Sequence, residues 1–472
     1  MGISPVIWWV RRDLRLNDNP ALAAALASGA PVLPVFICDQ VLDGCGAAPK
    51  WRFGLGLETL ATKLEATGSR LILRRGDALE ELRGLIAETG ARAVHWTRQY
   101  DPAQIARDTA VKAGLKADGL TAESHGGHLL FEPWTVATGA GAFYKVYTPF
   151  WKSVRNRDPG APAPSPARLT PPEEWPASDT LSNWDLGAGM RRGRDVVRPY
   201  LTLGEDAALN RLEAFIAGRV AEYDRLRDIP GVEGTSGLSE NLAYGEISPR
   251  TVWAAGQRAL VEGKPGAETF LKELVWREFS YHLLFHTPHI ASGNWRPDWD
   301  NFPWQDGGPE AEAWKRGCTG VRFVDAAMRE MYVTGRMHNR GRMIVASYLT
   351  KHLMTHWQVG LKWFEACLVD WDPAANAMGW QWAAGSGPDA APYFRVFNPD
   401  TQLDKFDRDG AYQRAWLAEL YDAPSKTALS YFDAIPRNWG LSPDAPYPEP
   451  VVALDEGRQR ALAAYQARKA AA

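Results

Sequence analysis

The sequence predicts an α/β domain with a doubly wound parallel sheet at the N-terminus and an all-α domain at the C-terminus. Three observations predict this division. Short apolar runs alternate with helical segments in the first 130 residues, prolines crowd the stretch 158–176, and helical periodicity dominates from residue 204 onward. We therefore expect an α/β domain over 1–130, a linker over 131–203 and a helical domain over 204–472.

Strands are expected at 6–10, 31–39, 70–75, 91–96 and 121–124, with helices between them at 51–65, 78–89 and 102–113. An earlier helix begins near Pro20, which suits a first helical turn, with Asp18 or Asn19 as its cap. Ligands of such folds bind at the carboxyl ends of the strands. No GxGxxG motif follows a strand and no Walker loop occurs, so a nicotinamide or ATP site is not expected.

The stretch 158–176, DPGAPAPSPARLTPPEEWP, holds seven prolines in nineteen residues, which excludes a helix or a central strand. It is expected to run extended between the two domains. Beyond it, apolar residues at helical spacing predict helices at 205–225, 249–262, 267–286, 320–334, 340–356 and 359–369.

Composition limits the cellular setting more than the function. The net charge of −3 leaves room for a local cationic face that binds DNA. No apolar run approaches the length of a membrane span, and no signal peptide opens the chain. Nine histidines without an HxH or HExxH motif predict no metal site. A reduced, cytoplasmic protein is expected, because no CxxC pair occurs among the four cysteines, Cys38, Cys45, Cys318 and Cys367.

The stretch 371–382, WDPAANAMGWQW, suggests a ligand site. Asp372, Asn376 and Trp380 fall at i, i+4 and i+8, so a carboxylate, an amide and an indole would share one helical stripe. A flat polar ligand needs hydrogen-bond partners at its edge and aromatic surface near its face. The alternative is an aromatic-rich buried helix with a satisfied asparagine. Large aromatic side chains are abundant in this half, where 13 of the 21 tryptophans follow residue 200.

The segment 273–279, ELVWREF, offers a second constellation. Glu273, Trp276 and Arg277 stand at i, i+3 and i+4, so one helical face would present an acid, a stacking ring and a cation. Such a trio suits a nucleobase: a carboxyl with a raised pKa donates to a carbonyl, the indole stacks, and the guanidinium takes a phosphate. A surface ion pair beside a core tryptophan is the commoner explanation of this pattern.

Two further segments carry polar residues at helix starts. In 233–250, EGTSGLSENLAYGEISPR, hydroxyl side chains and glycines precede a helix and could hold a phosphate, although an ordinary capped turn explains them as well. In 337–343, MHNRGRM, Asn339 and Met343 lie on one line of a helix and His338 and Arg342 on the next, which suggests reading of polar edges. The alternative for His338 is a core histidine whose ring nitrogens are hydrogen-bonded within the protein.

These segments in this order resemble the DNA photolyase and cryptochrome family over nearly the whole chain. The resemblance rests on WREF, GRMHNR, the tract from WDPAANAMGWQW through FNP at residue 399, and EGTSGLSENLAYGEISPR. It implies an antenna domain, a linker and an all-α C-terminal FAD-binding domain that holds FAD in a U shape. Family members repair cyclobutane pyrimidine dimers in UV-damaged DNA, as excited reduced FAD lends the flipped-out lesion one electron. The alternative is a cryptochrome-type blue-light photoreceptor, and a flavoprotein with dark redox chemistry is a third reading.

The resemblance assigns roles position by position. Asn376 would face flavin N5, where plant cryptochromes carry Asp and animal ones commonly Cys, and a neutral donor there would support an anionic flavin. Histidines stand at the positions of Asn339 and Met343 in enzymes for (6-4) lesions, so their absence favours cyclobutane dimers. The catalytic group would be Glu273, Asn339, Met343 and Asn376. FAD would be bound by Tyr223, Thr235, Ser236, Leu238, Ser239, Arg342, Asp370, Asp372 and Asn376.

The family resemblance also implies partners for DNA and for electrons. DNA and the lesion would be bound by Trp276, Arg277, Arg340, Trp382, Arg227, Arg395 and Lys405. Trp380, Trp357 and Trp304 match the family's electron-transfer tryptophans, although three indoles are also good core fillers. For the antenna, Gln104 stands where folate-binding members favour glutamate, and 50–53 (KWRF) looks more like members that bind 8-hydroxy-5-deazaflavin. Methenyltetrahydrofolate, the deazaflavin or neither all stay open, and a monomer is expected.

Overall fold

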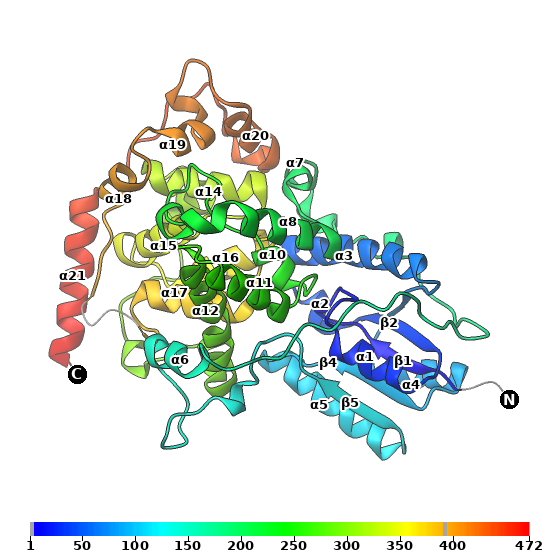
Figure 1. The fold of residues 1–472 in the computed structure, drawn as a ribbon. Coiled ribbons are helices and arrows are strands. Elements are labelled where there is room, and N and C mark those ends of the chain that lie inside the picture. The colour runs from blue at the N-terminus through cyan, green and yellow to red at the C-terminus, as the bar shows by residue number, and fades with distance from the viewer. Residues whose placement is uncertain (1–3, 390–393, 472) are drawn as a thin grey trace.

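The computed structural model describes residues 4–389 and 394–471. Residues 390–393, within the tract that carries the resemblance, lie outside the described part. A strand-containing portion, blue to cyan in Figure 1, lies beside a larger helical portion, green to red. The long helix α3 (Ala47–Ala66) runs between them and packs against α16 (Trp357–Cys367) of the helical portion.

The sheet has five parallel strands in the order β3-β2-β1-β4-β5. Val6 of β1 pairs with Val32 of β2 on one side and with Ala93 of β4 on the other, so the strand order reverses direction at β1. This confirms the predicted doubly wound parallel sheet. The strands are β1 (Val6–Trp9), β2 (Val32–Cys38), β3 (Ile72–Arg75), β4 (Ala93–Thr97) and β5 (Thr121–His125).

Helices cover both faces of this sheet. Successive side chains of each strand point to opposite sides, and apolar side chains on both sides pack against helices. Trp8 packs in a core with Leu22 and Leu57, whereas its neighbour Trp9 packs in a second core with Leu82 and Val111. Of the two caps that the sequence offered, Asn19 caps the first helix by accepting from Leu22 N at 3.1 Å. The helices are α1 (Pro20–Ala27), α2 (Gln40–Asp43), α3, α4 (Ala78–Thr89) and α5 (Pro102–Ala117).

The proline-rich stretch runs without helix or strand along the sheet portion. Backbone hydrogen bonds hold it there: Val32 N donates to Thr170 O at 3.1 Å, and Leu169 N donates to Thr67 O at 3.0 Å. The preceding helix α6 (Tyr147–Val154) packs instead against α12 (Ala267–His286) of the helical portion. The segment 131–203 therefore contributes side chains to both portions.

From residue 204 the described chain is helical, with a single isolated β-bridge between Gln305 and Thr355. Two predicted helices are shorter than expected. The first ends at Ala217 because Gly218 leaves helical backbone geometry, and the one predicted over 340–356 becomes a π-helix at Tyr348–His352. The α-helices are α7 (Gly193–Val197), α8 (Glu205–Ala217), α9 (Tyr223–Leu226), α10 (Ser239–Ala243), α11 (Pro249–Val261), α12, α13 (Pro309–Arg316), α14 (Arg322–Thr334), α15 (Asn339–Ser347), α16, α17 (Pro373–Ala384), α18 (Pro399–Phe406), α19 (Ala411–Trp416), α20 (Lys426–Ala434) and α21 (Leu454–Ala471).

Buried charges join the two portions. The Arg52 guanidinium of α3 donates to both carboxylate oxygens of Glu246, at 2.9 and 2.6 Å, and both side chains are fully buried. The Asp18 carboxylate accepts from Arg250 Nε at 3.0 Å, and Glu205 accepts the backbone N–H of Leu16 at 3.0 Å. These pairs fix the sheet portion against α8, α11 and the turn that precedes α11. Within the described residues, no helix is long and apolar enough to cross a membrane.

Candidate functional site

The N-terminus of α17 organises the first group of polar side chains. Asp372 caps this helix by accepting from Ala375 N at 2.8 Å, with Pro373 at the first helical position. The same carboxylate accepts the Tyr281 hydroxyl of α12 at 2.8 Å. Burial and the neighbouring Asp372 charge raise the pKa of Tyr281 well above its usual value, so its proton stays on the donor.

Asn376 lies one turn into α17 and is 7% exposed. Its amide nitrogen donates to the Asp372 carbonyl at 2.9 Å, and only the NH2 end of the amide can make this bond. The amide oxygen has no hydrogen-bond partner among the described residues. One N–H of the amide is used in this bond, so Asn376 can still offer a ligand its second N–H and its oxygen.

Gly379, one turn further along α17, is exposed, and a Cβ placed on it would meet no atom of the described chain within 4 Å. Its neighbours Ala377 and Trp380 are buried. Asn376 and Gly379 are three residues apart, so the backbone at Gly379 and the Asn376 side chain lie on one face of α17. An uncrowded helical face of this kind fits the edge of a flat ring system.

Arg342 and Asp370 form the second polar group. Arg342 of α15 donates from one terminal nitrogen to both oxygens of Asp370, at 2.9 and 2.8 Å, and from Nε to the Met337 carbonyl at 2.8 Å. His338 caps α15 by accepting from Arg340 N at 3.1 Å. Burial lowers the pKa of His338 to about 4, so its ring stays neutral and keeps the lone pair that the cap needs.

The loop before α10 holds the predicted phosphate-side residues. Thr235 and Ser236 are half-buried, Leu238 is buried and Ser239 is exposed. Glycine is required at 234, because a Cβ there would lie 2.6 Å from the Leu226 carbonyl oxygen. The fifth predicted residue on this side, Tyr223, is buried against Phe215 and Phe270 in the adjacent core.

Two arginines beside this loop were missed by the sequence reasoning. Arg211 of α8 donates to the Gly237 carbonyl at 2.7 Å and lies 3.6 Å from Glu240, and Arg336 lies 3.9 Å from the same carboxylate. They bring two cations to the loop that carries Thr235 and Ser236. Neither stands in a recognisable motif, and only the fold brings them together.

Glu273 and Trp276 lie on one face of α12, as predicted. Glu273 pairs with Arg227, and both side chains remain partly exposed, at 29% and 23%. Burial raises the pKa of Glu273, and the Arg227 guanidinium opposes that rise. The Trp276 ring stacks on Tyr147 of α6, with centroids 3.6 Å apart and planes 8° from parallel. Tyr147 was not identified from the sequence, where only the aromatic-rich segment 143–151 hints at it.

Arg277 does not join this face, which corrects one expectation. Its guanidinium donates to the His128 carbonyl at 2.9 Å, lies 3.4 Å from Glu278, and leaves the side chain 11% exposed. It lies 4.0 Å from Asp372, on the inner side of α12. A helix turns by about 100° per residue, so one step from Trp276 is enough to aim Arg277 inward. A phosphate contact for Arg277 is therefore unsupported.

The remaining lesion and DNA residues occupy exposed or half-buried places. Asn339 is exposed at the start of α15, and Met343 and Trp382 are half-buried against the same hydrophobic core. Arg340 pairs with Asp228 at 2.7 Å and stacks on Phe406 at 4.3 Å, and Lys405 lies 4.9 Å from that ring. Phe406 thus brings these two cations together, whereas exposed Arg395 lies over a different ring, Phe397.

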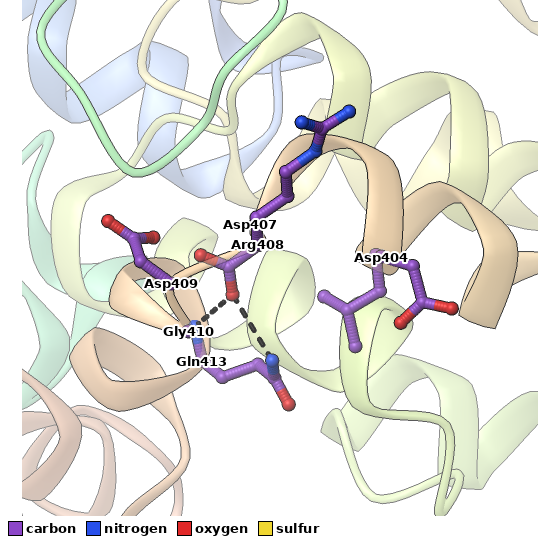
Figure 2. A pocket seen from close by; sticks show the side chains of 7 residues that line it. Asp404, Asp407, Arg408, Asp409, Gly410 and Gln413 are labelled. Carbon is purple, nitrogen blue, oxygen red and sulfur yellow. Dashed lines mark hydrogen bonds between the residues drawn. The ribbon is translucent and has the colours of Figure 1, made fainter.

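A separate surface pocket of about 410 Å³ lies at the end of α18 (Figure 2). Asp404, Asp407 and Asp409 line it with one arginine, Arg408, so its field disfavours phosphate. Asp407 accepts from Gln413 N at 3.0 Å, which anchors the start of α19. No residue predicted for the site lines this pocket.

The three predicted electron-transfer tryptophans differ in exposure. Trp380 and Trp357 are buried, and Trp304 is half-buried. Trp380 lies directly on the backbone of α16, since a Cβ on Gly360 would come within 2.0 Å of its ring. His356 links the other two: its ring centroid is 5.1 Å from that of Trp304 and 5.5 Å from that of Trp357.

The residues considered for binding an antenna chromophore, the KWRF segment and Gln104, do not form a common site. Trp51, Arg52 and Phe53 are buried in interdomain and core contacts, so of the KWRF segment only Lys50 keeps some exposure. Gln104 is half-buried, and its backbone N–H donates to the helix cap Asp101 at 3.2 Å.

A doubly wound sheet portion beside a helical portion that carries clustered polar side chains is an architecture that family models identify. Residues 6–169 match the model described as DNA photolyase, and residues 270–467 match the FAD binding domain of DNA photolyase. The chain belongs to the DNA photolyase family.

Individual relatives cover almost the whole chain. The deoxyribodipyrimidine photo-lyase of Agrobacterium fabrum is 46% identical over 99% of this chain and 98% of its own length. The enzyme of the same name from Escherichia coli is 37% identical over 98% of both chains. A class III photolyase structure from Agrobacterium tumefaciens has a TM-score of 0.91 at 46% identity, covering 100% and 98% of the two chains. A Synechocystis cryptochrome structure has a TM-score of 0.84 at 26% identity, covering 100% and 99%.

Proposed function

We propose that this protein is a deoxyribodipyrimidine photo-lyase that splits cyclobutane pyrimidine dimers in UV-damaged DNA with blue light. One observation carries the proposal. Helix α17 packs against both α12 and α15, so the cofactor-side group (Asp372, Asn376, Arg342 and Asp370) lies beside the lesion-side group (Glu273, Trp276 and Met343). Tyr281 links the two groups directly, because α12 carries it along with Trp276 and it donates to Asp372.

FAD fits the cofactor side of this arrangement. The free amide oxygen of Asn376 and the bare helix at Gly379 suit the ring edge, and Arg342 with Asp370 places a balanced charge pair nearby. Thr235, Ser236, Leu238 and Ser239 would hold the phosphates beside Arg211 and Arg336, with Tyr223 packed alongside. Bound there in its reduced, light-excited form, FAD supplies the electron that opens the cyclobutane ring.

The lesion side receives a flipped-out dimer. A dimer pairs and stacks poorly, so extruding it costs less than extruding intact bases. Trp276, held rigid by Tyr147, forms an apolar wall with Trp382 and Met343 that excludes water, and Asn339 lies at the rim. Arg227 turns to a DNA phosphate and releases Glu273. The Glu273 carboxyl, whose pKa is raised by burial, then donates a hydrogen bond to a dimer carbonyl and stabilises the negative charge that develops there.

DNA approaches through partly exposed cations, which makes binding dependent on salt. Arg340 and Lys405 on Phe406, with Arg227 and Arg395, hold the backbone of the damaged strand. Trp380, Trp357 and Trp304, with His356 between the last two, carry electrons inward to restore the reduced cofactor.

Several finer assignments belong to this proposal. The protein acts as a cytoplasmic monomer, in keeping with its four free cysteines. Its units are an antenna domain over 1–130, a linker over 131–203 and a catalytic domain over 204–472. Methenyltetrahydrofolate and 8-hydroxy-5-deazaflavin remain alternative antenna chromophores, and the buried side chains of KWRF weaken the argument for the second. A cryptochrome-type photoreceptor is the second candidate function, favoured by the similar cryptochrome structure.

Light-driven repair tests the proposal directly. Reduced protein is mixed with thymine-dimer DNA, illuminated with blue light, and the return of thymine absorbance is followed. Wild type should restore the bases. Glu273→Gln should lower repair per absorbed photon about two- to tenfold, the effect of one hydrogen bond worth about 0.5–1.5 kcal/mol. Glu268→Gln, an exposed change on the same helix, is the control. A protein that binds FAD, restores no bases and does not prefer damaged DNA would instead be a photoreceptor.

A further inference from the structure

The sheet edge carries a cluster of two histidines and a glutamate that the repair chemistry does not use. His95 lies on β4, and Glu123 and His125 lie on the neighbouring edge strand β5. His95 pairs in register with Glu123, and Thr97 pairs with His125. Alternate residues of paired strands share one face, so all three side chains project from the same side of the sheet. Figure 1 shows β5 beside β4 at the edge of the sheet portion.

The ligand atoms of this cluster lie at metal-binding separations. His95 Nδ1 and His125 Nε2 are 3.0 Å apart, His95 Nδ1 lies 3.9 Å from a Glu123 oxygen, and all three ligand atoms lie within 4.8 Å of one another. Two nitrogens that bind one Zn²⁺ at about 2.0–2.1 Å lie roughly 2.9–3.4 Å apart for angles between a right angle and the tetrahedral angle. The histidine pair already satisfies this spacing, and Glu123, with a 57% exposed side chain, can rotate toward it.

We propose that His95, Glu123 and His125 form a binding site for a divalent transition-metal ion, with Zn²⁺ the best match. Imidazole nitrogen with one carboxylate suits Zn²⁺ better than Mg²⁺ or Ca²⁺, which prefer oxygen ligands. Three protein ligands leave a fourth position for water, as in open zinc sites. The ion would link edge strand β5 to β4.

The surroundings permit a cation despite two nearby positive side chains. Arg98 is engaged, since it donates to Glu132 at 2.7 Å and to the Ser124 carbonyl at 2.7 Å. Lys112 reaches the Ser124 hydroxyl at 3.3 Å, and Ser124 points to the opposite face of the sheet from Glu123 and His125. Burial also lowers the pKa of both histidines, to about 4 for His125, so their rings keep the lone pairs that a metal requires.

The cluster was missed by motif searching, which predicted no metal site. Its ligands come from two strands and become neighbours only through strand pairing, so no HxH or HExxH pattern marks them. The alternative is a pair of neutral histidines joined by one hydrogen bond, and the two readings differ in their response to zinc.

Zinc binding to the full-length flavoprotein, stripped with a chelator and desalted, tests the site. Isothermal titration with Zn²⁺ should show one tight site in wild type. His125→Gln should weaken it by at least about 100-fold, because even partners outside the ligand set typically change affinity about 10- to 100-fold. His289→Gln, an exposed histidine outside the cluster, should leave the affinity unchanged. Glu123→Gln, at an exposed position that folding tolerates, should weaken binding about tenfold.

X-ray absorption of the one-to-one zinc complex gives an independent readout. Two imidazoles at about 2.0–2.1 Å should surround the ion. Zinc should raise the melting temperature of wild type and of His289→Gln, but not of His125→Gln, because binding only to the folded state stabilises it. Fewer than two imidazoles at the metal, or equal affinity in wild type, Glu123→Gln and His125→Gln, would overturn the site. Failure of light-driven repair would leave these outcomes unaffected.

Discussion

Tyr147 and Trp276 lie face to face, with ring centroids 3.6 Å apart and planes 8° from parallel. The Tyr147 hydroxyl donates to the Lys272 carbonyl at 2.6 Å, so the phenol is fixed at both its face and its edge. This contact ties helix α6, which precedes the proline-rich stretch, to the indole proposed to stack on a lesion. The wall of that site is therefore built from two distant parts of the chain.

Tyr147→Ala should weaken binding of thymine-dimer DNA about two- to tenfold, because an aromatic pair is worth about 0.5–1.5 kcal/mol and Trp276 would lose its support. Tyr147→Phe is the matched control, since it keeps the ring and removes only the bond to Lys272. Fluorescence anisotropy with damaged and intact duplexes measures both. Equal affinity of the alanine and wild-type proteins for damaged DNA would contradict a role for the stack.

Trp380→Phe should reduce photoreduction of the oxidised cofactor to a small fraction of the wild-type rate, because Trp380 shares α17 with Asn376 and its ring packs on α16, the helix that begins at Trp357. Repair by protein that has already been reduced chemically should persist. Trp416→Phe removes another buried indole of the same core and serves as control. Absorbance changes at the flavin bands under blue light provide the rates, and unchanged photoreduction in Trp380→Phe would remove this residue from the path.

Asn376→Asp should lower the midpoint potential of the bound flavin by tens of millivolts, since about 30 mV corresponds to about 1.4 kcal/mol for a two-electron couple. The new carboxylate opposes the negative charge of the reduced flavin and loses the donor to the Asp372 carbonyl. Asn183→Asp adds the same charge at an exposed turn of the linker and should not change the potential. Spectroelectrochemical titration decides, and an unshifted potential would place Asn376 away from the ring.

Glu278 should make stability depend on pH. Its side chain is 3% exposed, and burial raises its pKa from the ordinary 4.5 to about 7. Between these values the folded state holds a proton that the unfolded state has lost. The free energy of unfolding should therefore fall as pH rises from about 4.5 to 7, by up to about 3 kcal/mol from this group.

Glu278→Gln cannot titrate, so its stability should change less over that range than the stability of wild type. The exposed Glu58→Gln is the control and should follow wild type. Denaturant unfolding at pH 4.5, 5.5, 6.5 and 7.5 measures the slopes. An equal slope in Glu278→Gln and wild type would assign the pH dependence to other groups.

The central strands of the α/β portion were predictable because they are buried on both faces. The apolar run 31–39 became β2 at Val32–Cys38. The edge strand β5 (Thr121–His125) is partly exposed, and the stretch 121–124 predicted it more weakly. Helix ends were less predictable. Apolar spacing continues past Ala217, where a glycine breaks the helix, and it does not reveal where α-helical turns become π-helical at Tyr348.

In the site, spacing within one helix was informative and contacts between helices were not. Asp372 and Asn376 lie one turn apart and are hydrogen-bonded, as their i, i+4 spacing suggested. The same rule placed Arg277 beside Trp276, but neighbours from the sheet portion draw it inward to His128. Tyr147, Arg211 and Arg336 carry no local signal, because packing between distant segments brings them to the site.

The fully buried pair of Arg52 and Glu246 has a consequence for how the molecule comes apart. Separating the sheet portion from the helices would break this ion pair and leave a guanidinium and a carboxylate that are now hydrogen-bonded to each other and shielded from water without a partner. Heat should consequently melt both halves together, and a calorimeter should record one endotherm where two independent modules would give two.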